Sequence, residues 1–358
     1  MMKAPLSLAR KDVLELTPYS SARSLNLEAD ILLDANECPW PPCPGDDRAL
    51  GLNRYPDPQP RALLSALSAL YGVPEESLFL GRGTDDAIDA LVRTFCQAGE
   101  NDILVCPPTY GVYGVAARIQ GAGVRAVPLT KEPAFQPDVP AILRAWDPRL
   151  RLVFFCSPNN PTGNAMDADS VVEVCEAFRE KAVVVLDEAY AEFSSKPSLI
   201  TRLEGLPNLV ILRTLSKAWA LAGARCGAAL GDPRIMGLLH KVRAPYPLSL
   251  PSVRAALRAL SPQGKRLCSG RVKRLRSERE RLAGALSALP GVEKVYPSDA
   301  NFLLARVKDA GEVFERCKSH GILVRDRGSE PGLSRCVRIT VGRPEENDRL
   351  LDALERED

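Results

Sequence analysis

The sequence predicts an α/β protein with two domains, a large one built on a mainly parallel, helix-flanked sheet and a smaller α+β one. Three observations lead to this prediction. The chain has 358 residues, more than a single domain usually holds. Through its first two-thirds, short and nearly continuous apolar runs alternate with helical patterns, as expected for parallel strands buried on both faces. A Pro-rich segment, residues 244–252, then separates this part from the remainder.

The expected elements of the large domain follow one another in the order strand, helix, strand. The apolar runs predict strands at 101–108, 123–130, 151–158, 182–190 and 208–217. The helical patterns that lie among them cover 85–99, 110–123 and 167–181. Ligands of such sheets bind beyond the carboxyl ends of the strands. Polar residues that directly follow these strands are therefore candidates for a functional site.

The last third of the chain predicts the smaller domain. A long helical run follows the Pro-rich segment, and a further helix is expected at 309–321. Strands are expected at 291–297, 301–307, 322–326 and 336–342. The Pro-rich N-terminal part has little helix or strand character. We therefore expect an N-terminal arm at 1–45 that packs with the small domain, a large domain at 46–247 and a small domain at 248–358.

Composition argues against several functional classes. The net charge of +2 gives no general attraction to nucleic acid or to acidic membranes. No apolar run is long enough to cross a membrane, and the N-terminus lacks the pattern of a signal peptide. Ten scattered cysteines without C-x-x-C spacing, and only two histidines, argue against a zinc site. Together these features favour a reducing cytoplasm.

One locally basic run, residues 265–282, raises the question of a nucleic-acid patch. Glu278 and Glu280 lie among its arginines. A solvated helix face explains such a mixture better than a binding patch. We therefore expect neither nucleic acid nor a membrane as a partner.

The first chemical motif is GRGTDDAIDALVRTF, which begins at Gly81. Gly81 and Gly83 permit a tight turn, and Thr84 or Asp85 can cap the helix that follows. Free amide groups at the start of that helix would bind an anion. An ordinary capped turn explains the same pattern, and for this motif taken alone it is the favoured interpretation.

Two further polar positions follow buried strands. Asn160 stands in the turn NNPTG, whose prolines and glycine project it above the sheet. Asp187 ends a run of four apolar residues, where a carboxylate needs a cationic partner or several donors. Tyr190, three residues further on, can point into the same cleft. A plain turn and a structural ion pair are the simpler alternatives.

Lys217 also follows a strand, with Thr214 and Ser216 beside it and Arg225 eight residues further on. A partly desolvated lysine near other cations has a lowered pKa and becomes a nucleophile. The two hydroxyl groups and the arginine are suited to hold a phosphate. Solvent-facing cations are the alternative, but they fit poorly with the apolar residues at 218–222.

One cofactor satisfies all of these groups. Pyridoxal 5′-phosphate (PLP) offers a phosphate, an aldehyde for Lys217 and a ring nitrogen for Asp187. A carboxylate beside that nitrogen keeps it protonated, so the ring can withdraw electrons. Tyr110 offers a flat face on which the ring can stack.

The sequence resembles the fold-type I PLP-dependent aminotransferases of class II, and among them the histidinol-phosphate aminotransferase family. The resemblance runs through nearly the whole chain. Its clearest motifs are CSPNNPTG at 156–163, LDEAYAEF at 186–193, RTLSKAWALAGARCG at 213–227 and VRITVG at 337–342. One departure is GTDD in the turn at 83–86, where the family usually has a small residue followed by Asp-Glu.

The resemblance implies a role for each matching residue. Lys217, Asp187 and Tyr190 are expected to be catalytic. Cofactor contacts are expected from Thr84, Asp85, Tyr110, Asn160, Asp187, Tyr190, Thr214, Ser216, Lys217 and Arg225. Tyr55 is expected to reach the cofactor phosphate of a neighbouring subunit, which implies a homodimer with composite sites. Around the substrate the resemblance places Tyr19, Asn36, Arg325 and Arg338.

The implied reaction transfers the amino group of L-histidinol phosphate to 2-oxoglutarate, a step of histidine biosynthesis that yields imidazole acetol phosphate and glutamate. Arg338 suits both substrates, because a guanidinium pairs with phosphate and with carboxylate. A threonine-phosphate decarboxylase and an aromatic amino acid aminotransferase are alternatives on the same fold. A ligand sensor is a third, although no segment remains for an added DNA-binding domain.

Overall fold

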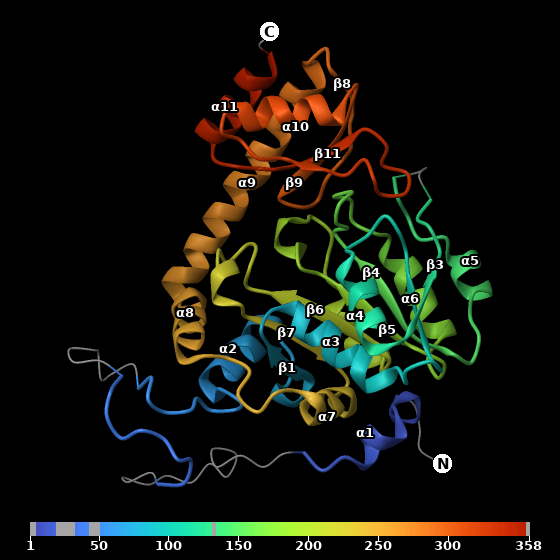
Figure 1. Cartoon of the computed structure of the whole chain (residues 1–358), viewed down its shortest axis with the longest axis vertical. Coiled ribbons are helices and arrows are strands. Elements are labelled where there is room, and N and C mark those ends of the chain that lie inside the picture. Colours follow the sequence, from blue (N-terminus) through green and yellow to red (C-terminus); the bar gives the residue numbers. More distant parts are fainter. Residues whose placement is uncertain (1–4, 19–32, 43–50, 131–133, 356–358) are drawn as a thin grey trace.

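The computed structural model describes residues 5–18, 33–42, 51–130 and 134–355. A large domain with a seven-stranded sheet and a small domain with a four-stranded sheet lie at opposite ends of a long helix, α9 (Pro262–Ala288). Figure 1 shows the small domain above the large one, with α9 rising between them on one side. The two-domain α/β architecture predicted from the sequence is confirmed.

The large sheet has the strand order β1-β7-β6-β5-β4-β2-β3. Its strands are β1 (Leu78–Gly81), β2 (Asp102–Val105), β3 (Gly123–Ala126), β4 (Leu150–Cys156), β5 (Val183–Asp187), β6 (Leu209–Thr214) and β7 (Gly227–Gly231). The five predicted strands form the parallel part, β6-β5-β4-β2-β3. The sequence did not predict β1 and β7, and β7 runs antiparallel to both of its neighbours. Its sequence, GAALG, has few of the residues that favour strands.

Helices cover both faces of this sheet and bury its apolar side chains. The helices are α2 (Arg61–Tyr71), α3 (Thr84–Phe95), α4 (Val112–Gln120), α5 (Val139–Arg144), α6 (Ala168–Ala177) and α7 (Pro233–Val242). On one face α3, α4 and α7 pack against residues such as Phe154 and Val185. On the other, α2, α5 and α6 pack against residues such as Phe155 and Leu186. Successive side chains of β4 and β5 thus point to opposite faces, and helices cover both faces. This explains why the sequences of these strands are continuous apolar runs.

The small domain packs helices against an antiparallel sheet with the order β10-β11-β9-β8. Its elements are β8 (Val292–Val295), β9 (Phe302–Val307), α10 (Ala310–Ser319), β10 (Arg325–Asp326), β11 (Cys336–Thr340) and α11 (Pro344–Glu355). Leu282 of α9, Leu303, Val337 and Leu350 lie together in its core. Before α9, helix α8 (Leu250–Leu260) still contacts α2 of the large domain.

The described part of the N-terminal arm lies against the large domain. Leu8 and Val13, the latter in α1 (Lys11–Glu15), pack with Leu239 of α7. Glu37 forms a 2.8 Å ion pair with Arg54. In Figure 1 α1 lies beside α7, at the far end of the molecule from the small domain. The predicted contact between arm and small domain therefore stays a prediction for the rest of residues 1–45.

The basic run 265–282 lies within α9, and most of its residues are exposed. Among its basic residues Arg279 is buried, and it donates to the carbonyl oxygens of Ala300 at 2.9 Å and Phe193 at 3.4 Å. These bonds tie α9 to loops of both domains. Within the described ranges, no helix is both long and apolar enough to cross a membrane.

Five short 3-10 helices complete the described secondary structure. They cover Leu6–Leu8, Glu75–Ser77, Ala191–Phe193, Leu199–Gly205 and Ala222–Ala224.

Candidate active site

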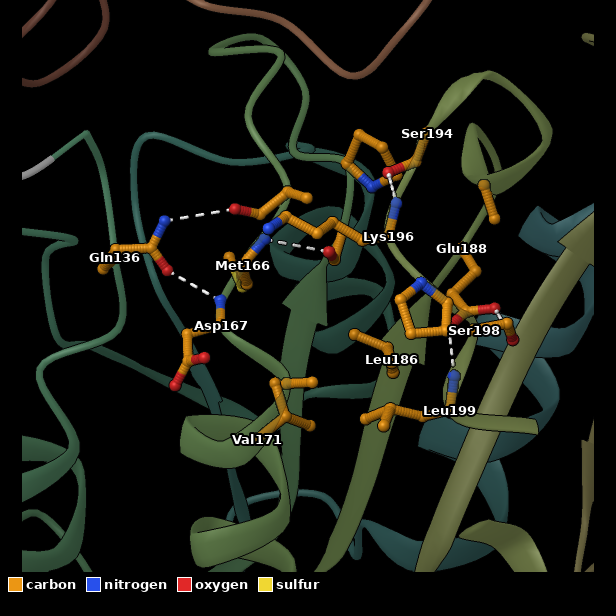
Figure 2. A pocket seen from close by; sticks show the side chains of 16 residues that line it. Gln136, Met166, Asp167, Val171, Leu186, Glu188, Ser194, Lys196, Ser198 and Leu199 are labelled. Atoms are coloured by element: carbon orange, nitrogen blue, oxygen red, sulfur yellow. Dashed lines mark hydrogen bonds between the residues drawn. The ribbon is translucent and has the colours of Figure 1, made fainter. Parts of the chain in front are cut away.

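Two cavities flank the end of β5, on opposite faces of the large sheet. The smaller, of about 320 Å³, lies beside Leu186 and is shown in Figure 2. Its polar side chains are engaged within the chain. Gln136 accepts from the amide of Asp167 at 2.8 Å, and Glu188 accepts from the amide of Leu199 at 3.0 Å. Among the described residues that line this cavity, no buried polar side-chain atom lacks a hydrogen-bond partner.

The larger cavity is a cleft of about 710 Å³ between the strand ends of the large domain and β10–β11 of the small domain. Most of the predicted site residues meet here. Those that line the cleft are Thr84, Asp85, Tyr110, Asn160, Asp187, Tyr190, Thr214, Ser216, Lys217, Arg225, Arg325 and Arg338. The rule that ligands bind beyond the carboxyl ends of strands thus located the cleft correctly.

Asp187 is the last residue of β5 and is buried, with 3% of its surface exposed. One oxygen, Oδ2, accepts from the hydroxyl of Tyr113 at 2.8 Å, and the other accepts from the amide of Ala189 at 3.1 Å. Burial raises the pKa of Asp187 to about 6, although the hydrogen bond from Tyr113 opposes this change. The carboxylate is therefore held by neutral donors and is suited to a cationic partner from the cleft.

Sequence reasoning did not find Tyr113. It lies on α4, three residues after Tyr110, which precedes the helix. Their ring centroids are 5.6 Å apart in an edge-to-face arrangement. Its partner Asp187 lies 74 residues further along the chain, so local sequence spacing does not connect the two.

Lys217 lies three residues beyond the end of β6. Burial lowers its pKa, the Arg338 cation lowers it further, and the carboxylate of Asp187 opposes both. The preceding Arg213 anchors the strand end through ion pairs to Glu188 at 3.0 Å and Glu192 at 2.8 Å. A fixed amine with a lowered pKa is suited to act as a nucleophile and as a base.

An anion seat lies at the start of α3. Gly83 has a φ of +83°, and a Cβ placed there would lie 2.7 Å from Nη2 of Arg225. No side chain caps α3, so its first amide groups face the cleft unbonded by a cap. Beside them the hydroxyl of Thr214 donates to Ser216 Oγ at 2.9 Å. The amides, hydroxyls and guanidinium together form a site for a phosphate-sized anion.

We expect Gly83→Ala to weaken cofactor binding at least tenfold, because the added Cβ displaces the guanidinium of Arg225. Absorbance titration of the cofactor-free variant with PLP measures this effect. Gly99→Ala is the matched control, since Gly99 has a φ of +72° but no neighbour within 4 Å of its Cβ position. If both variants lose the same affinity for PLP, backbone strain alone explains the effect.

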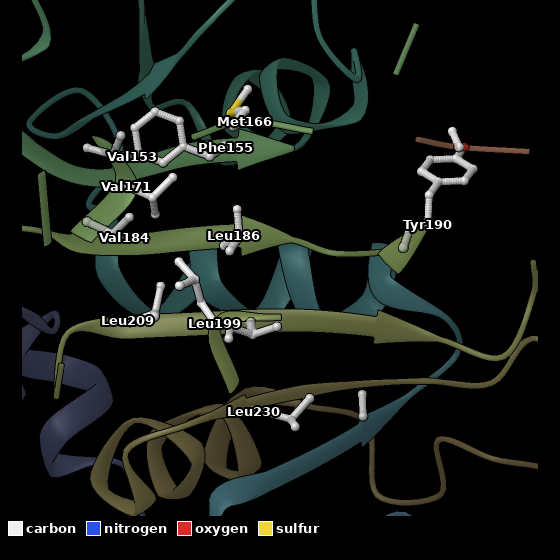
Figure 3. Close-up of a cluster of buried hydrophobic side chains, with 14 of the residues drawn as sticks. Val153, Phe155, Met166, Val171, Val184, Leu186, Tyr190, Leu199, Leu209 and Leu230 are labelled. Carbon is white, nitrogen blue, oxygen red and sulfur yellow. The ribbon is translucent and has the colours of Figure 1, made fainter. Parts of the chain in front are cut away.

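Tyr190 lies where the sheet ends and the cleft begins. Figure 3 shows it beyond the tip of β5, away from aliphatic side chains such as Leu186 that line the sheet. Its hydroxyl accepts from Nδ2 of Asn160 at 3.5 Å, and its ring lies 5.5 Å from Nζ of Lys217. Arg338 of the small domain donates to Oδ1 of the same asparagine. Asn160 therefore connects the two walls of the cleft.

Among the described residues, two of the predicted ones do not line this cleft. Tyr55 is half exposed and stacks on Tyr246, with ring centroids 4.5 Å apart. Asn36 is exposed and has a φ of +54°. Tyr19 lies outside the described residues. The cleft also contains Arg327, which sequence reasoning passed over although it stands two residues after Arg325.

The chain matches the model of the family "Aminotransferase class I and II" over residues 32–354. The chain belongs to the class I and II aminotransferases. The described residues contain no group of three or more His, Cys, Asp or Glu placed to hold a metal ion.

Curated relatives align with this aminotransferase over almost its whole length. A histidinol-phosphate aminotransferase of Xanthomonas euvesicatoria pv. vesicatoria is 46% identical over 98% of this chain and 97% of its own. One of Xylella fastidiosa is 45% identical over 98% of this chain and 96% of its own. Among solved structures, histidinol-phosphate aminotransferase from Sinorhizobium meliloti in complex with PLP has a TM-score of 0.78 at 27% identity. It covers 97% of this chain and 96% of that one.

The cleft of this aminotransferase fits PLP on the structural observations alone. The buried carboxylate of Asp187 suits a protonated ring nitrogen. The amine of Lys217, whose pKa is lowered, suits an aldehyde. The turn at Gly83 lets the guanidinium of Arg225 lie where a side chain would not fit, and this cation at the start of α3 suits a phosphate. These three groups line one cleft, and PLP is the cofactor of this enzyme family.

Proposed function

We propose that this chain is a PLP-dependent histidinol-phosphate aminotransferase, which transfers the amino group of L-histidinol phosphate to 2-oxoglutarate in histidine biosynthesis. The products are imidazole acetol phosphate and glutamate. The observation that carries the proposal is the near full-length similarity to relatives of that name, 46% identity over 98% of the chain. The cleft supports it, because it combines a reactive lysine with arginines suited to anionic substrates.

Within the proposed reaction, Lys217, Asp187 and Tyr190 are the catalytic residues. Bound PLP supplies an electron-withdrawing ring that stabilises negative charge at the substrate carbon. With PLP bound, the amine of Lys217 would hold the cofactor aldehyde; once the substrate amine has displaced it, the freed amine would take a proton from the substrate carbon and pass it on. Asp187 would hold positive charge at the ring nitrogen, and Tyr190 and Asn160 would hydrogen-bond the ring oxygen.

The remaining contacts orient the cofactor. The phosphate is held at the start of α3 and by the side chains beyond β6, and the ring stacks on Tyr110. The residues we assign to the phosphate are Thr84, Asp85, Thr214, Ser216 and Arg225. Asp85 accepts from Arg225 at 3.2 Å and from the hydroxyl of Tyr110 at 3.1 Å. It thereby positions both the phosphate ligand and the stacking ring.

Arg325 and Arg338 bind the anionic end of either substrate in this proposal. They stand directly opposite each other on the antiparallel pair β10–β11. A guanidinium fork pairs with a phosphate in one half-reaction and a carboxylate in the other.

Arg338→Ala is expected to raise KM for both histidinol phosphate and 2-oxoglutarate, each by about 10- to 100-fold. This is the effect expected from the loss of one hydrogen bond to a charged group. Steady-state kinetics with each substrate varied in turn measure both values. Arg343→Ala is the control, because Arg343 is exposed and pairs with Glu346 away from the cleft. Unchanged KM for both substrates would remove Arg338 from the binding site.

We further propose a cytoplasmic homodimer with composite active sites. Tyr55 supports this, because it is 50% exposed on the surface of one chain, with Trp40 (72%) and Leu52 (48%) also exposed. A second copy can bury these side chains and receive the hydroxyl of Tyr55 at its cofactor phosphate. Tyr19 and Asn36 are proposed to border the substrate in the same assembly. The free cysteines of the described residues are compatible with a reducing compartment.

A substrate panel on the purified, PLP-loaded protein tests the proposed function. It compares histidinol phosphate, phenylalanine, aspartate and threonine phosphate, each with and without 2-oxoglutarate. We expect the highest kcat/KM with histidinol phosphate and a strict need for 2-oxoglutarate. Carbon dioxide release from threonine phosphate without an oxo acid would identify a decarboxylase instead. A preference for phenylalanine would identify an aromatic aminotransferase.

A further inference from the structure

Three arginines line the small-domain end of the cleft, one more than the sequence singled out. Arg325 pairs across the sheet with Arg338, and the amide of Arg327 donates to the carbonyl of Cys336 at 2.8 Å. The pairing thus continues one residue beyond β10. Because side chains two residues apart in an extended strand share a face, Arg325 and Arg327 both project into the cleft.

Arg327 is held in place but incompletely satisfied. Its side chain is 18% exposed, and Nη1 forms a 2.8 Å ion pair with Oε1 of Glu330. Within the described residues, its buried Nε has no hydrogen-bond partner, and neither has Oε2 of Glu330. A buried guanidinium nitrogen without an acceptor costs free energy, so Glu330 satisfies Arg327 only in part.

The charges at this end do not balance. Three guanidinium groups face a single carboxylate, that of Glu330, which leaves two positive charges among the groups that interact here. Burial lowers the pKa of Arg338, and the neighbouring cation of Arg327 lowers it further. Burial also raises the pKa of Glu330, although Arg327 opposes this. A phosphate monoester carries nearly two negative charges at pH 7, whereas a single carboxylate carries one.

We propose that Arg327, held by Glu330, is a specificity-determining residue that selects a dianionic phosphate monoester over a carboxylate at this end of the cleft. The proposal rests on the function proposed above and refines it. Histidinol phosphate brings a phosphate to the arginines, while 2-oxoglutarate brings one carboxylate. Arg338 therefore serves both substrates, and Arg327 serves the phosphorylated one.

The test measures binding of two probes that have no amino group, phenyl phosphate and glutarate. Calorimetry on the PLP-loaded protein gives both dissociation constants, with the cofactor's own phosphate already filling the seat at α3. Arg327→Gln is expected to weaken the binding of phenyl phosphate about tenfold, which is the effect of losing one charge-assisted hydrogen bond. The binding of glutarate is expected to weaken less than about twofold. Arg316→Gln, which removes an arginine paired with Glu312 on α10, is expected to change neither. Equal weakening of both probes, or of neither, overturns the proposal.

Arg327→Gln leaves the carboxylate of Glu330 without its cationic partner, and a second comparison removes that carboxylate. In a Glu330→Gln background, the further change Arg327→Gln leaves no unpaired acid, so the variant is expected to fold. It must again weaken phenyl phosphate selectively, and Glu330→Gln alone must tighten it. Loss of selectivity in this pair would also overturn the proposal.

Failure of the proposed function is a separate outcome. If wild-type protein does not turn over histidinol phosphate while Arg327→Gln still weakens phenyl phosphate selectively, the substrate is wrong and the role of Arg327 stands. If turnover is normal but the two probes respond alike, the function stands and the role of Arg327 is wrong.

Discussion

Lys217→Ala is expected to abolish measurable transamination. Proton transfer by a positioned base contributes roughly 10²–10⁴-fold to a rate, and this variant also loses the covalent anchor of the cofactor. The lowered pKa of Lys217 follows from burial and from the cation of Arg338, and no other lysine lines the cleft in the described residues. Turnover, together with the absorbance of bound PLP, measures the loss.

Borohydride reduction followed by peptide mapping gives a result that does not depend on activity. The label is expected on the peptide that contains Lys217. Lys196→Ala is the matched control, because Lys196 is exposed beside the smaller cavity and should retain both activity and label. Normal rates in Lys217→Ala, or a label on another lysine, would show that the nucleophile has been misassigned.

Asp187→Asn is expected to lower kcat by roughly 10²–10³-fold, the usual effect of removing one preorganised electrostatic contact. The amide has the same shape as the carboxylate but carries no charge to hold a protonated ring nitrogen. The variant should bind PLP more weakly as well. Kinetics and PLP titration measure the two effects separately.

The same substitution is expected to stabilise the cofactor-free protein above pH 6. Burial raises the pKa of Asp187 from 3.8 to about 6, so the folded state binds this proton more tightly than the unfolded state does. Stability therefore falls as pH rises from about 4 to 6, and the buried charge costs about 3 kcal/mol above that range. The neutral amide of the variant carries no such cost, whereas at pH 4 the two proteins should unfold alike.

Thermal unfolding of the cofactor-free proteins between pH 4 and pH 8 measures this difference. Tyr113→Phe supplies a second comparison, because it removes the hydrogen bond that lowers the pKa of Asp187. Without this bond the folded-state pKa of Asp187 is higher, so the pH range over which stability falls should extend to higher pH. A stability difference between wild type and Asp187→Asn that does not change with pH would contradict the assignment.

Residues whose position depends on the local chain were predictable from the sequence. Asp187 and Lys217 follow buried apolar runs, so their strands alone place them at the edge of the sheet. The same holds for Asn160, which follows β4. Tyr113 and Arg327 were missed, because their importance depends on what lies opposite them in space. Neither the buried carboxylate beside Tyr113 nor the arginines around Arg327 could be placed there from sequence spacing alone.

The strands β1 and β7 were missed for a different reason. Both are short, and β7 consists of glycine, alanine and one leucine, which pack as a strand only because β6 and β1 enclose it. Gly227 shows the constraint, since a Cβ there would lie 2.7 Å from the carbonyl carbon of Gly83. Tertiary packing, rather than intrinsic preference, therefore determines this part of the sheet. Tyr55 and Asn36 stay predictions because their expected partner is another subunit.

The three arginines at the small-domain end of the cleft belong to a single stretch, 325–338, that contributes none of the groups assigned to the cofactor. Mutations at Arg325 and Arg327 can therefore alter which molecule is accepted while the catalytic residues, which are encoded upstream, stay in place; Arg338 differs, because it bonds to Asn160 and lowers the pKa of Lys217. Over evolutionary time such a separation lets gene duplicates acquire new metabolic roles through few changes. An engineer can exploit the same separation by randomising these positions while leaving the rest of the gene untouched.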